Sequence, residues 1–389
     1  MWLISEDIDY YKDTVKKFSL DIQNQELLIF PQENEIYQKI SQRSNYPDKH
    51  FVVLSTEYPS KKLESIFIIK ELPLKKGFLS TQQFNANIEI SEALQRRLGI
   101  SVINSPYKLS DVGGAFALKE YAKNVIEAEK CGYKCKGIFL VGVPGTGKTF
   151  FPKCFAGELN RPIIQLNLSE IIESDKPIAK LNSIFFFLTK MQKLYPTSKY
   201  IILIDEIEKM IGNSSASSGE KQILGRLLTV LNDMHTEASE FNFDAIFFAT
   251  ANNLGNILSE NPEFLRRGRW NELFFIHLPT EEFAEEIFRI YIKKKKLEAI
   301  FQEEQDLKDL MSDIICEYSR TSLDGRFPYT AAEIESFCDR ISFFLISKKE
   351  KFDAKQDIKR CIKDIFPISK TAFSSVSGMV AQKDLFVEI

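Results

Sequence analysis

Eight consecutive residues near the middle of the chain carry the pattern with the most specific chemistry. The run is Gly142-Val143-Pro144-Gly145-Thr146-Gly147-Lys148-Thr149, which fits G-x-x-x-x-G-K-[ST]. Glycines let the backbone curl so that successive N–H groups point at phosphate oxygens, and a following helix adds its positive dipole end. Lys148 can reach the β- and γ-phosphates, and the Thr149 hydroxyl can ligate Mg²⁺. All eight residues are therefore predicted to bind ATP, with Mg²⁺ at Thr149.

A second candidate lies at residues 201–206. Ile201-Ile202-Leu203-Ile204 is a short apolar run typical of a buried strand, and Asp205 and Glu206 follow it. Ligands bind at the carboxyl ends of strands in doubly wound sheets. Asp205 is expected to hold Mg²⁺ through water, and Glu206 to orient or deprotonate the attacking water. Glu208 and Lys209 come next and are interpreted as a solvated pair on a helix.

The elements that must position these residues follow from the hydrophobic pattern. Strands and helices alternate over residues 107–279, which predicts an α/β core with a mainly parallel sheet. Residues 280–389 have apolar residues at helical spacing, so a helical lid and tail are expected there. Residues 1–106 are polar with short apolar islands, which predicts a small α/β region including a helix at 33–43. The fold class is thus a P-loop α/β core with a C-terminal helical lid.

The N-terminal region shows a faint internal echo of the core. Its apolar runs at 26–30, 51–56 and 66–73 match in order the runs at 200–206, 245–250 and 273–279. One interpretation is a shortened, degenerate copy of the later half of the core, without a phosphate loop or an Asp-Glu pair. An unrelated small α/β domain with chance similarity is an equally acceptable interpretation.

Composition narrows the class of protein. The chain has 389 residues, 44% of them hydrophobic, and a net charge of -3, so a strongly basic nucleic-acid binder is not indicated. Its six cysteines form no C-x-x-C pair, and no H-E-x-x-H occurs, which argues against a zinc site. No apolar run approaches the ~20 residues of a membrane span, and the first residues lack a signal-peptide pattern. A cytoplasmic location is expected.

With both motifs in hand, the chain resembles the AAA family of ATPases over about residues 109–369. Asp111-Val112-Gly113-Gly114 looks like the family's segment that passes the adenine. Ala249-Thr250-Ala251-Asn252 looks like its sensor-1 strand, which makes Asn252 the match for the water-orienting asparagine, with Asn253 as the fallback. Residues 264–271 resemble L-R-P-G-R-F-D, so Arg266 and Arg269 match the two arginine fingers that reach a neighbouring subunit's site.

The resemblance implies Mg²⁺-dependent ATP hydrolysis coupled to remodelling of a macromolecular partner, most simply a protein. Fingers acting in trans imply a homo-oligomer, a ring of six being one form. Tyr329-Thr330-Ala331-Ala332-Glu333 resembles the sensor-2 helix start, and Thr330 with Glu333 also makes a capping box. Tyr291 stands where the lid usually offers a histidine to the adenine. Stand-alone AAA proteins of bacteria and plastids match this single-core pattern best.

Two departures bear on mechanism. Pro152 lies in the helix after the phosphate loop, where it is expected to fall beyond the first turn and remove one helix hydrogen bond. Residues 168–177 lack the aromatic-apolar-Gly pore loop of polypeptide-threading relatives. An alternative function is therefore a nucleotide-gated interaction protein with little hydrolysis. A nucleic-acid remodeller is a further rival, against which the net charge argues.

Overall fold

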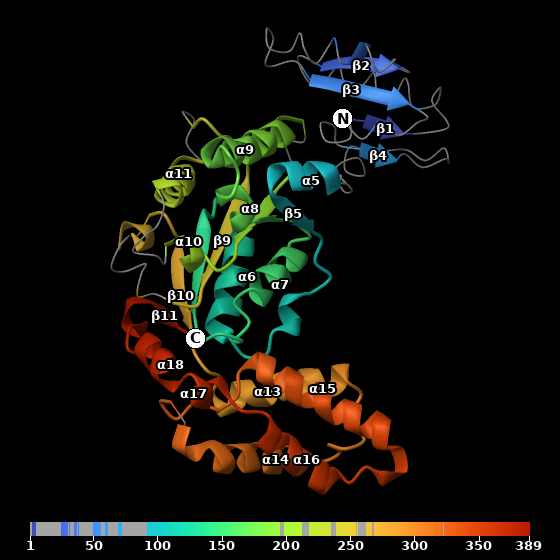
Figure 1. Cartoon of the computed structure of the whole chain (residues 1–389), viewed down its shortest axis with the longest axis vertical. Helices are drawn as coiled ribbons and strands as arrows, with labels where there is room; N and C mark the ends of the chain where they lie inside the picture. Colours follow the sequence, from blue (N-terminus) through green and yellow to red (C-terminus); the bar gives the residue numbers. More distant parts are fainter. Residues whose placement is uncertain are drawn as a thin grey trace. The chain divides into compact units, whose positions relative to one another are not determined.

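The computed structural model forms two compact units (Figure 1). The first comprises residues 1–102 and 173–198, and the second comprises residues 103–172 and 199–389. The structure describes residues 2–4, 25–29, 31, 35–36, 38, 50–55, 59–60, 69–71, 92–194, 198–211, 218–234, 239–253, 255, 262–266, 268–321 and 323–389. Most of the helix predicted at 33–43 lies outside these residues.

The described part of the first unit contains a parallel four-stranded sheet. Its strands are β1 (Trp2–Ile4), β2 (Gln25–Ile29), β3 (His50–Ser55) and β4 (Ile69–Glu71). They lie in the order β2-β3-β1-β4, and all three pairings are parallel. The unit also contains α5 (Glu92–Leu98), α9 (Pro177–Leu194) and most of β5 (Ile100–Ile103). Of the apolar run at 66–73, the structure describes only Ile69–Glu71.

The second unit is built on a buried parallel sheet. Its strands lie in the order β11-β10-β6-β9-β8-β7, and each neighbouring pair is parallel. Their bounds are β6 (Gly137–Gly142), β7 (Ile163–Leu166), β8 (Tyr200–Ile204), β9 (Ala245–Ala251), β10 (Glu272–Ile276) and β11 (Val387–Glu388). Every residue of β6, β8 and β9 is buried, as expected of strands covered on both faces. The predicted α/β core with a parallel sheet is confirmed.

The two sheets share an arrangement. Four strands of each sheet correspond in chain order, β1, β2, β3 and β4 in one and β6, β8, β9 and β10 in the other, where β7 also comes between β6 and β8. In space the orders are β2-β3-β1-β4 and β8-β9-β6-β10, so corresponding strands have corresponding neighbours. The short strand β1 takes the place of β6, the strand that precedes the phosphate loop.

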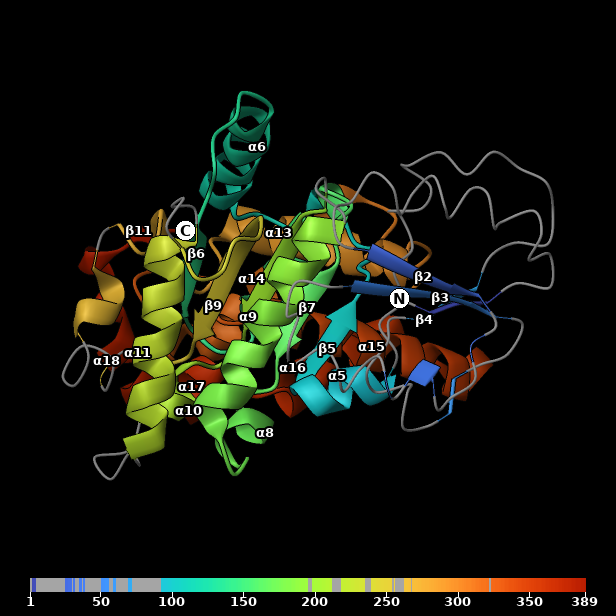
Figure 2. The same ribbon diagram turned by 90° about the horizontal axis from the view of Figure 1, so that it is seen from above.

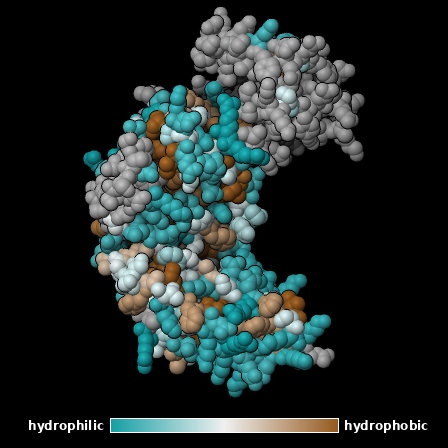
Figure 3. All heavy atoms as spheres, in the orientation of Figure 1, coloured by the Kyte–Doolittle hydropathy of each residue, from teal (hydrophilic) through white to brown (hydrophobic). Residues whose placement is uncertain are grey.

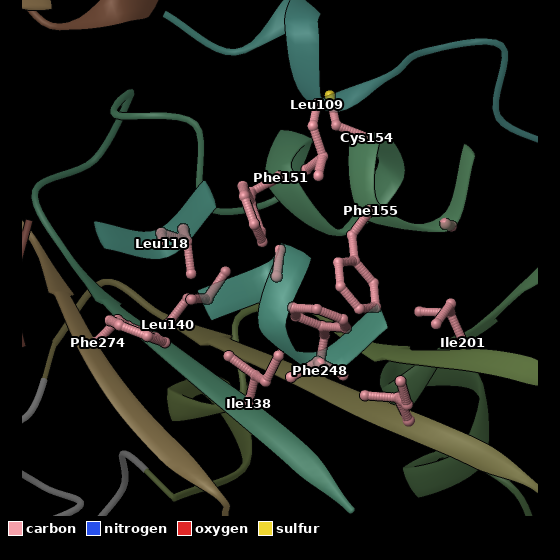
Figure 4. Packing of buried hydrophobic residues seen from close by; sticks show 14 of the residues in the cluster. Leu109, Leu118, Ile138, Leu140, Phe151, Cys154, Phe155, Ile201, Phe248 and Phe274 are labelled. Carbon is pink, nitrogen blue, oxygen red and sulfur yellow. The ribbon is translucent and has the colours of Figure 1, made fainter. Parts of the chain in front are cut away.

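Aromatic side chains pack the helices of the second unit onto its sheet. Phe151 and Phe155 of α7 (Phe150–Glu158) point toward Phe248 of β9 and Ile138 of β6 (Figure 4). The ring centroids of Phe155 and Phe248 are 5.3 Å apart in an edge-to-face arrangement. Other elements are α6 (Phe116–Lys130), α8 (Leu168–Ile172), α10 (Glu208–Ile211), α11 (Ser218–Asp233) and the 3₁₀ turns Leu109–Asp111 and Pro262–Leu265.

The predicted lid is a cluster of helices with its own apolar core. It consists of α13 (Glu281–Lys294), α14 (Glu304–Tyr318), α15 (Ala331–Lys348) and α16 (Ala354–Asp364), with 3₁₀ turns at Ser319–Thr321 and Lys349–Lys351. Its visible face is largely hydrophilic, with scattered hydrophobic residues (Figure 3). None of the helices in the described ranges is long and apolar enough to cross a membrane.

The tail returns from the lid to the sheet. Beyond Pro367 come α17 (Ile368–Thr371), α18 (Phe373–Val380), the 3₁₀ turn Lys383–Leu385 and β11. The Glu333 carboxylate accepts the Ile368 N–H at 2.6 Å, and β11 pairs with β10. Both views show α18 and β11 on the same side of the second unit (Figure 2). Pro367 thus lies between α16, which ends at Asp364, and α17.

Candidate functional site

The predicted phosphate loop directly follows β6 and runs into α7. Gly142 has φ +146°, and a Cβ there would lie 2.0 Å from the carbonyl oxygen of Ile276 in the neighbouring β10. Gly145 has φ +80°, and its Cβ would lie 2.9 Å from the Thr330 hydroxyl of the lid. Both positions therefore require glycine for the backbone conformation and for a close approach. The loop has the geometry that its sequence pattern predicts.

Pro152 leaves the loop helix without one of its hydrogen bonds, as expected. The Phe151 N–H donates to the Gly147 carbonyl at 2.9 Å, so helical bonding begins before Phe150, the first residue assigned to α7. Proline has no N–H with which to donate next to the Lys148 carbonyl. The helix nevertheless continues through Glu158.

Lys148 is held inside the loop. It is 5% exposed, and its Nζ donates to the carbonyl oxygens of Gly142 at 2.9 Å and Val143 at 2.7 Å. Burial lowers the pKa of Lys148 to about 8, although the carboxylates of Glu208 and Asp205 act in the opposite direction. A bound phosphate would replace the two backbone carbonyls as the partner of this ammonium group.

Asp205 lies at the end of β8 within reach of two hydroxyls. Thr149 Oγ1 donates to Asp205 Oδ1 at 2.9 Å, and Thr250 Oγ1 donates to the same oxygen. A threonine hydroxyl and a carboxylate so close together are the hard oxygen ligands that Mg²⁺ prefers. The residues present thus fit the ion that the two motifs imply.

Thr250 is a site residue that the motif analysis did not assign a role. It is 2% exposed in β9, and its hydroxyl also accepts the Glu206 N–H at 2.9 Å. Its carbonyl accepts the Ile207 N–H at 2.9 Å. Thr250 therefore connects the sensor strand to both carboxylate residues. The available signal was a hydroxyl within an otherwise apolar run.

Glu206 has an unusual backbone, and each oxygen of its carboxylate has a protein partner. Its φ is +52°, in the left-handed region that non-glycine residues avoid and that is enriched at functional sites. Asn252 Nδ2 donates to Glu206 Oε1 at 3.3 Å. Glu206 Oε2 pairs with Lys209 Nζ. The predicted Glu206 and Asn252 are thus brought together.

The interpretation of Glu208 and Lys209 as a solvated helical pair is wrong. Glu208 Oε1 accepts the Asn252 N–H at 3.0 Å, and Oε2 is buried without a hydrogen bond in the described part of the chain. Burial raises the pKa of the Glu208 carboxyl above its usual range. Lys209 pairs with Glu206 instead of Glu208. Tertiary contacts with the sensor strand override the local spacing.

The two predicted arginine fingers lie between the turn Pro262–Leu265 and β10. Arg266 is exposed, and Arg269 donates to the carbonyl of Glu263. Among the described residues, neither arginine contacts the phosphate loop or the Asp205–Glu206 pair. Within the described part of the chain, neither guanidinium group therefore lies against the site of its own chain.

The lid contacts the phosphate loop and the segment expected to pass the base. The Ala332 N–H donates to the Gly145 carbonyl at 3.0 Å, at the capping box of α15. The Gly114 N–H donates to Glu286 of α13 at 2.8 Å. Tyr291 on the same helix donates to Glu335 at 3.1 Å, and burial raises the pKa of its phenol. The lid thus contacts the phosphate loop through the backbone hydrogen bond between Ala332 and Gly145.

The comparisons with known proteins agree with this geometry. The profile of the family described as "ATPase family associated with various cellular activities (AAA)" matches residues 138–278, which include the loop, Asp205–Glu206 and Asn252. The chain contains an AAA ATPase domain. Over 86% of its length it is 28% identical to an uncharacterized AAA domain-containing protein ycf46 of Gracilaria tenuistipitata var. liui.

More distant AAA relatives carry names with a stated activity. The chain is 27% identical, over 82% of its length and 79% of the relative's, to a proteasome-activating nucleotidase of Sulfurisphaera tokodaii. It is 27% identical, over 70% of its length and 44% of the relative's, to an ATP-dependent zinc metalloprotease FtsH of Aquifex aeolicus. The chain spans 65% of the length of the Gracilaria ycf46 protein and 51% of two further ycf46 proteins.

Proposed function

We propose that this protein hydrolyses ATP with Mg²⁺ and uses the cycle to remodel a protein partner. The observation that carries the proposal is the cluster of Thr149, Asp205, Thr250, Glu206 and Asn252, which joins three chain segments at one sheet edge. Each of these groups has the chemistry that phosphoryl transfer to water requires at that place. The AAA profile match supports the same activity.

Each residue has a distinct role in this proposal. The N–H groups of the loop and Lys148 bind the β- and γ-phosphates, and Thr149 and Asp205 hold the metal ion. When bound, Mg²⁺ neutralises charge on the phosphates. Glu206 accepts a proton from, or orients, the attacking water, and Asn252 keeps both carboxylate and water in place. Hydrolysis then changes the contact between Gly145 and Ala332, which moves the lid.

Two kinds of partner are proposed, further copies of this chain and a protein substrate. Within the described ranges, Arg266 and Arg269 have no contact with their own site, so we assign them to the site of a neighbouring copy, in a ring for which six subunits is one form. An arginine supplied in trans stabilises charge on the transferring phosphoryl group. A protein substrate fits the proteasome-activating and protease names of two relatives. Nucleic acid is not part of the proposal.

The domain organisation is proposed as residues 1–106, 107–279 and 280–389. The shared strand order of the two sheets supports a degenerate copy of the core in the first of these. Its sheet retains the places of β6, β8, β9 and β10. It has no equivalent of the loop pattern or of the Asp-Glu pair in its sequence, so it is assigned no hydrolysis.

Steady-state ATP hydrolysis against protein concentration tests the function, with Glu206→Gln as the matched control. Specific activity that rises with concentration and vanishes in the variant supports an oligomeric ATPase with shared sites. Tight ATP binding beside a flat, near-zero rate in both proteins would contradict it.

One observation favours a second candidate, a nucleotide-gated interaction protein with little hydrolysis. Both oxygens of the Glu206 carboxylate are engaged by protein groups, Asn252 and Lys209. A Glu206→Gln variant that keeps full activity on its biological partner would favour this candidate over the motor.

A further inference from the structure

The pair between Lys209 and Glu206 joins a surface cation to the residue assigned to activate water. Lys209 lies in the first turn of α10, three residues after Glu206, and Nζ contacts Glu206 Oε2. The Lys209 side chain is 70% exposed and the Glu206 side chain is 40% exposed. The hydrogen bond with Glu206 raises the pKa of Lys209, so the lysine is fully charged at neutral pH.

This contact matters because it holds a positive charge against the carboxylate that is assigned to activate water. Oε1 already accepts from Asn252 at 3.3 Å, and Oε2 is taken by Lys209. A water molecule that attacks a phosphate must donate to one of them. As that proton moves toward Glu206, the carboxylate loses negative charge and its attraction to Lys209 weakens. The pair is thus stronger before the reaction than in its transition state, and such an interaction slows the step.

The backbone cannot release the pair. The Glu206 N–H is held by Thr250 at 2.9 Å, the Ile207 N–H by the Thr250 carbonyl at 2.9 Å, and the Lys209 N–H by the Glu206 carbonyl at 3.0 Å. Only rotation of the two side chains separates the charges. Because Lys209 is exposed, an anionic group outside the chain can reach it and compete with Glu206.

We propose that Lys209 is a positioning residue that restrains Glu206 and lowers basal ATP turnover. The inference rests on the proposed hydrolysis and adds a regulatory contact to the same site. Turnover rises when Lys209 leaves Glu206, either through screening by salt or through a carboxylate offered by a docked protein.

The experiment compares kcat and the ATP dissociation constant of the full chain with those of Lys209→Met. Exposed ion pairs are weak, so removal should raise kcat by about two- to fivefold while ATP affinity stays the same. Lys209→Arg keeps a cation in reach of Glu206 and should keep the low rate. Lys134→Met, which removes a cation from the exposed loop before β6, controls for the loss of surface charge.

Ionic strength provides a second readout that a structural role would not give. At saturating ATP, raising NaCl from about 0.05 to about 0.5 M shortens the Debye length and should raise the wild-type kcat toward that of Lys209→Met. The variant's kcat should show no such rise. Equal or lower kcat in Lys209→Met, with turnover in both proteins, overturns the inference and leaves the ATPase intact. No turnover in either protein refutes the proposed function and this inference with it.

Discussion

The Thr250 hydroxyl provides the sharpest test of how the two motifs are joined. Thr250→Val keeps the shape and the β-branch but removes the donor to Asp205 and the acceptor for the Glu206 N–H. The residue is 2% exposed, so water has no ready access to replace the hydroxyl. The change therefore loosens both carboxylate residues while the phosphate loop is untouched.

The expected size follows from the kind of bond that is lost. A hydrogen bond to a charged group contributes about 1.5–3 kcal/mol, and a buried N–H left without a partner costs about 1–3 kcal/mol. If the lost hydrogen bond to the charged Asp205 raises the barrier to hydrolysis by its full contribution, kcat falls by roughly 10- to 100-fold, since about 1.4 kcal/mol is a factor of ten. The unpaired Glu206 N–H lowers the free energy of unfolding by about 1–3 kcal/mol.

The assay is ATP hydrolysis over a Mg²⁺ titration, with ATP binding measured separately. Thr250→Val should keep ATP binding and lose turnover, whereas Thr250→Ser, which retains the hydroxyl, should recover most of the rate. A Thr250→Val enzyme within twofold of wild type would refute the reasoning. Equal defects in the valine and serine variants would assign the effect to packing of the lost methyl group.

Three further variants test other parts of the molecule. Lys148→Ala should abolish measurable ATP binding because the buried ammonium is the loop's only side-chain cation, and normal affinity would contradict the loop assignment. Arg266→Ala should bind ATP without turnover, and mixing it with Lys148→Ala should restore part of the activity; verified mixed oligomers without recovery would argue against action in trans. Burial, reinforced by Arg326, lowers the pKa of His277 to about 4. The unfolded state, with a pKa near 6.5, therefore takes up the proton first, and stability is lost as pH falls below about 6.5. Denaturant titrations should show wild type losing about 1 kcal/mol more than His277→Gln between about pH 7 and 5.5, and parallel losses would contradict the shift.

Features with a local signal were predictable from the sequence. The phosphate loop and the Asp205–Glu206 strand end are contiguous patterns, and the structure gives both the expected geometry. The capping box of Thr330 and Glu333 is likewise local, and its hydrogen bonds are present. Such patterns hold because the interacting groups lie within a few residues of each other.

Features that depend on distant pairing were not predictable. Thr250 acts on Asp205 across 45 positions of sequence, and an apolar strand conceals its role. Glu208 has helical spacing to its neighbours, yet its partner is Asn252 on another strand. Strand β11 has only two residues, too few for any periodic signal, and forms because β10 offers an open edge. These contacts form only when the sheet brings together segments that are far apart in the sequence.

The return of the tail to the sheet has a mechanical consequence. The chain leaves the core after β10 and comes back as β11, where the Ile389 N–H donates to Phe275 at 2.9 Å and Arg326 pairs with Glu388. The chain therefore joins the lid to the sheet at two places, and two fixed points define one axis. If the hydrogen bonds of Ala332 to Gly145 and of Gly114 to Glu286 open, the lid is free to swing about the line between these points. Each turnover would then deliver its displacement along a fixed arc, which a neighbouring copy can receive as a repeatable stroke.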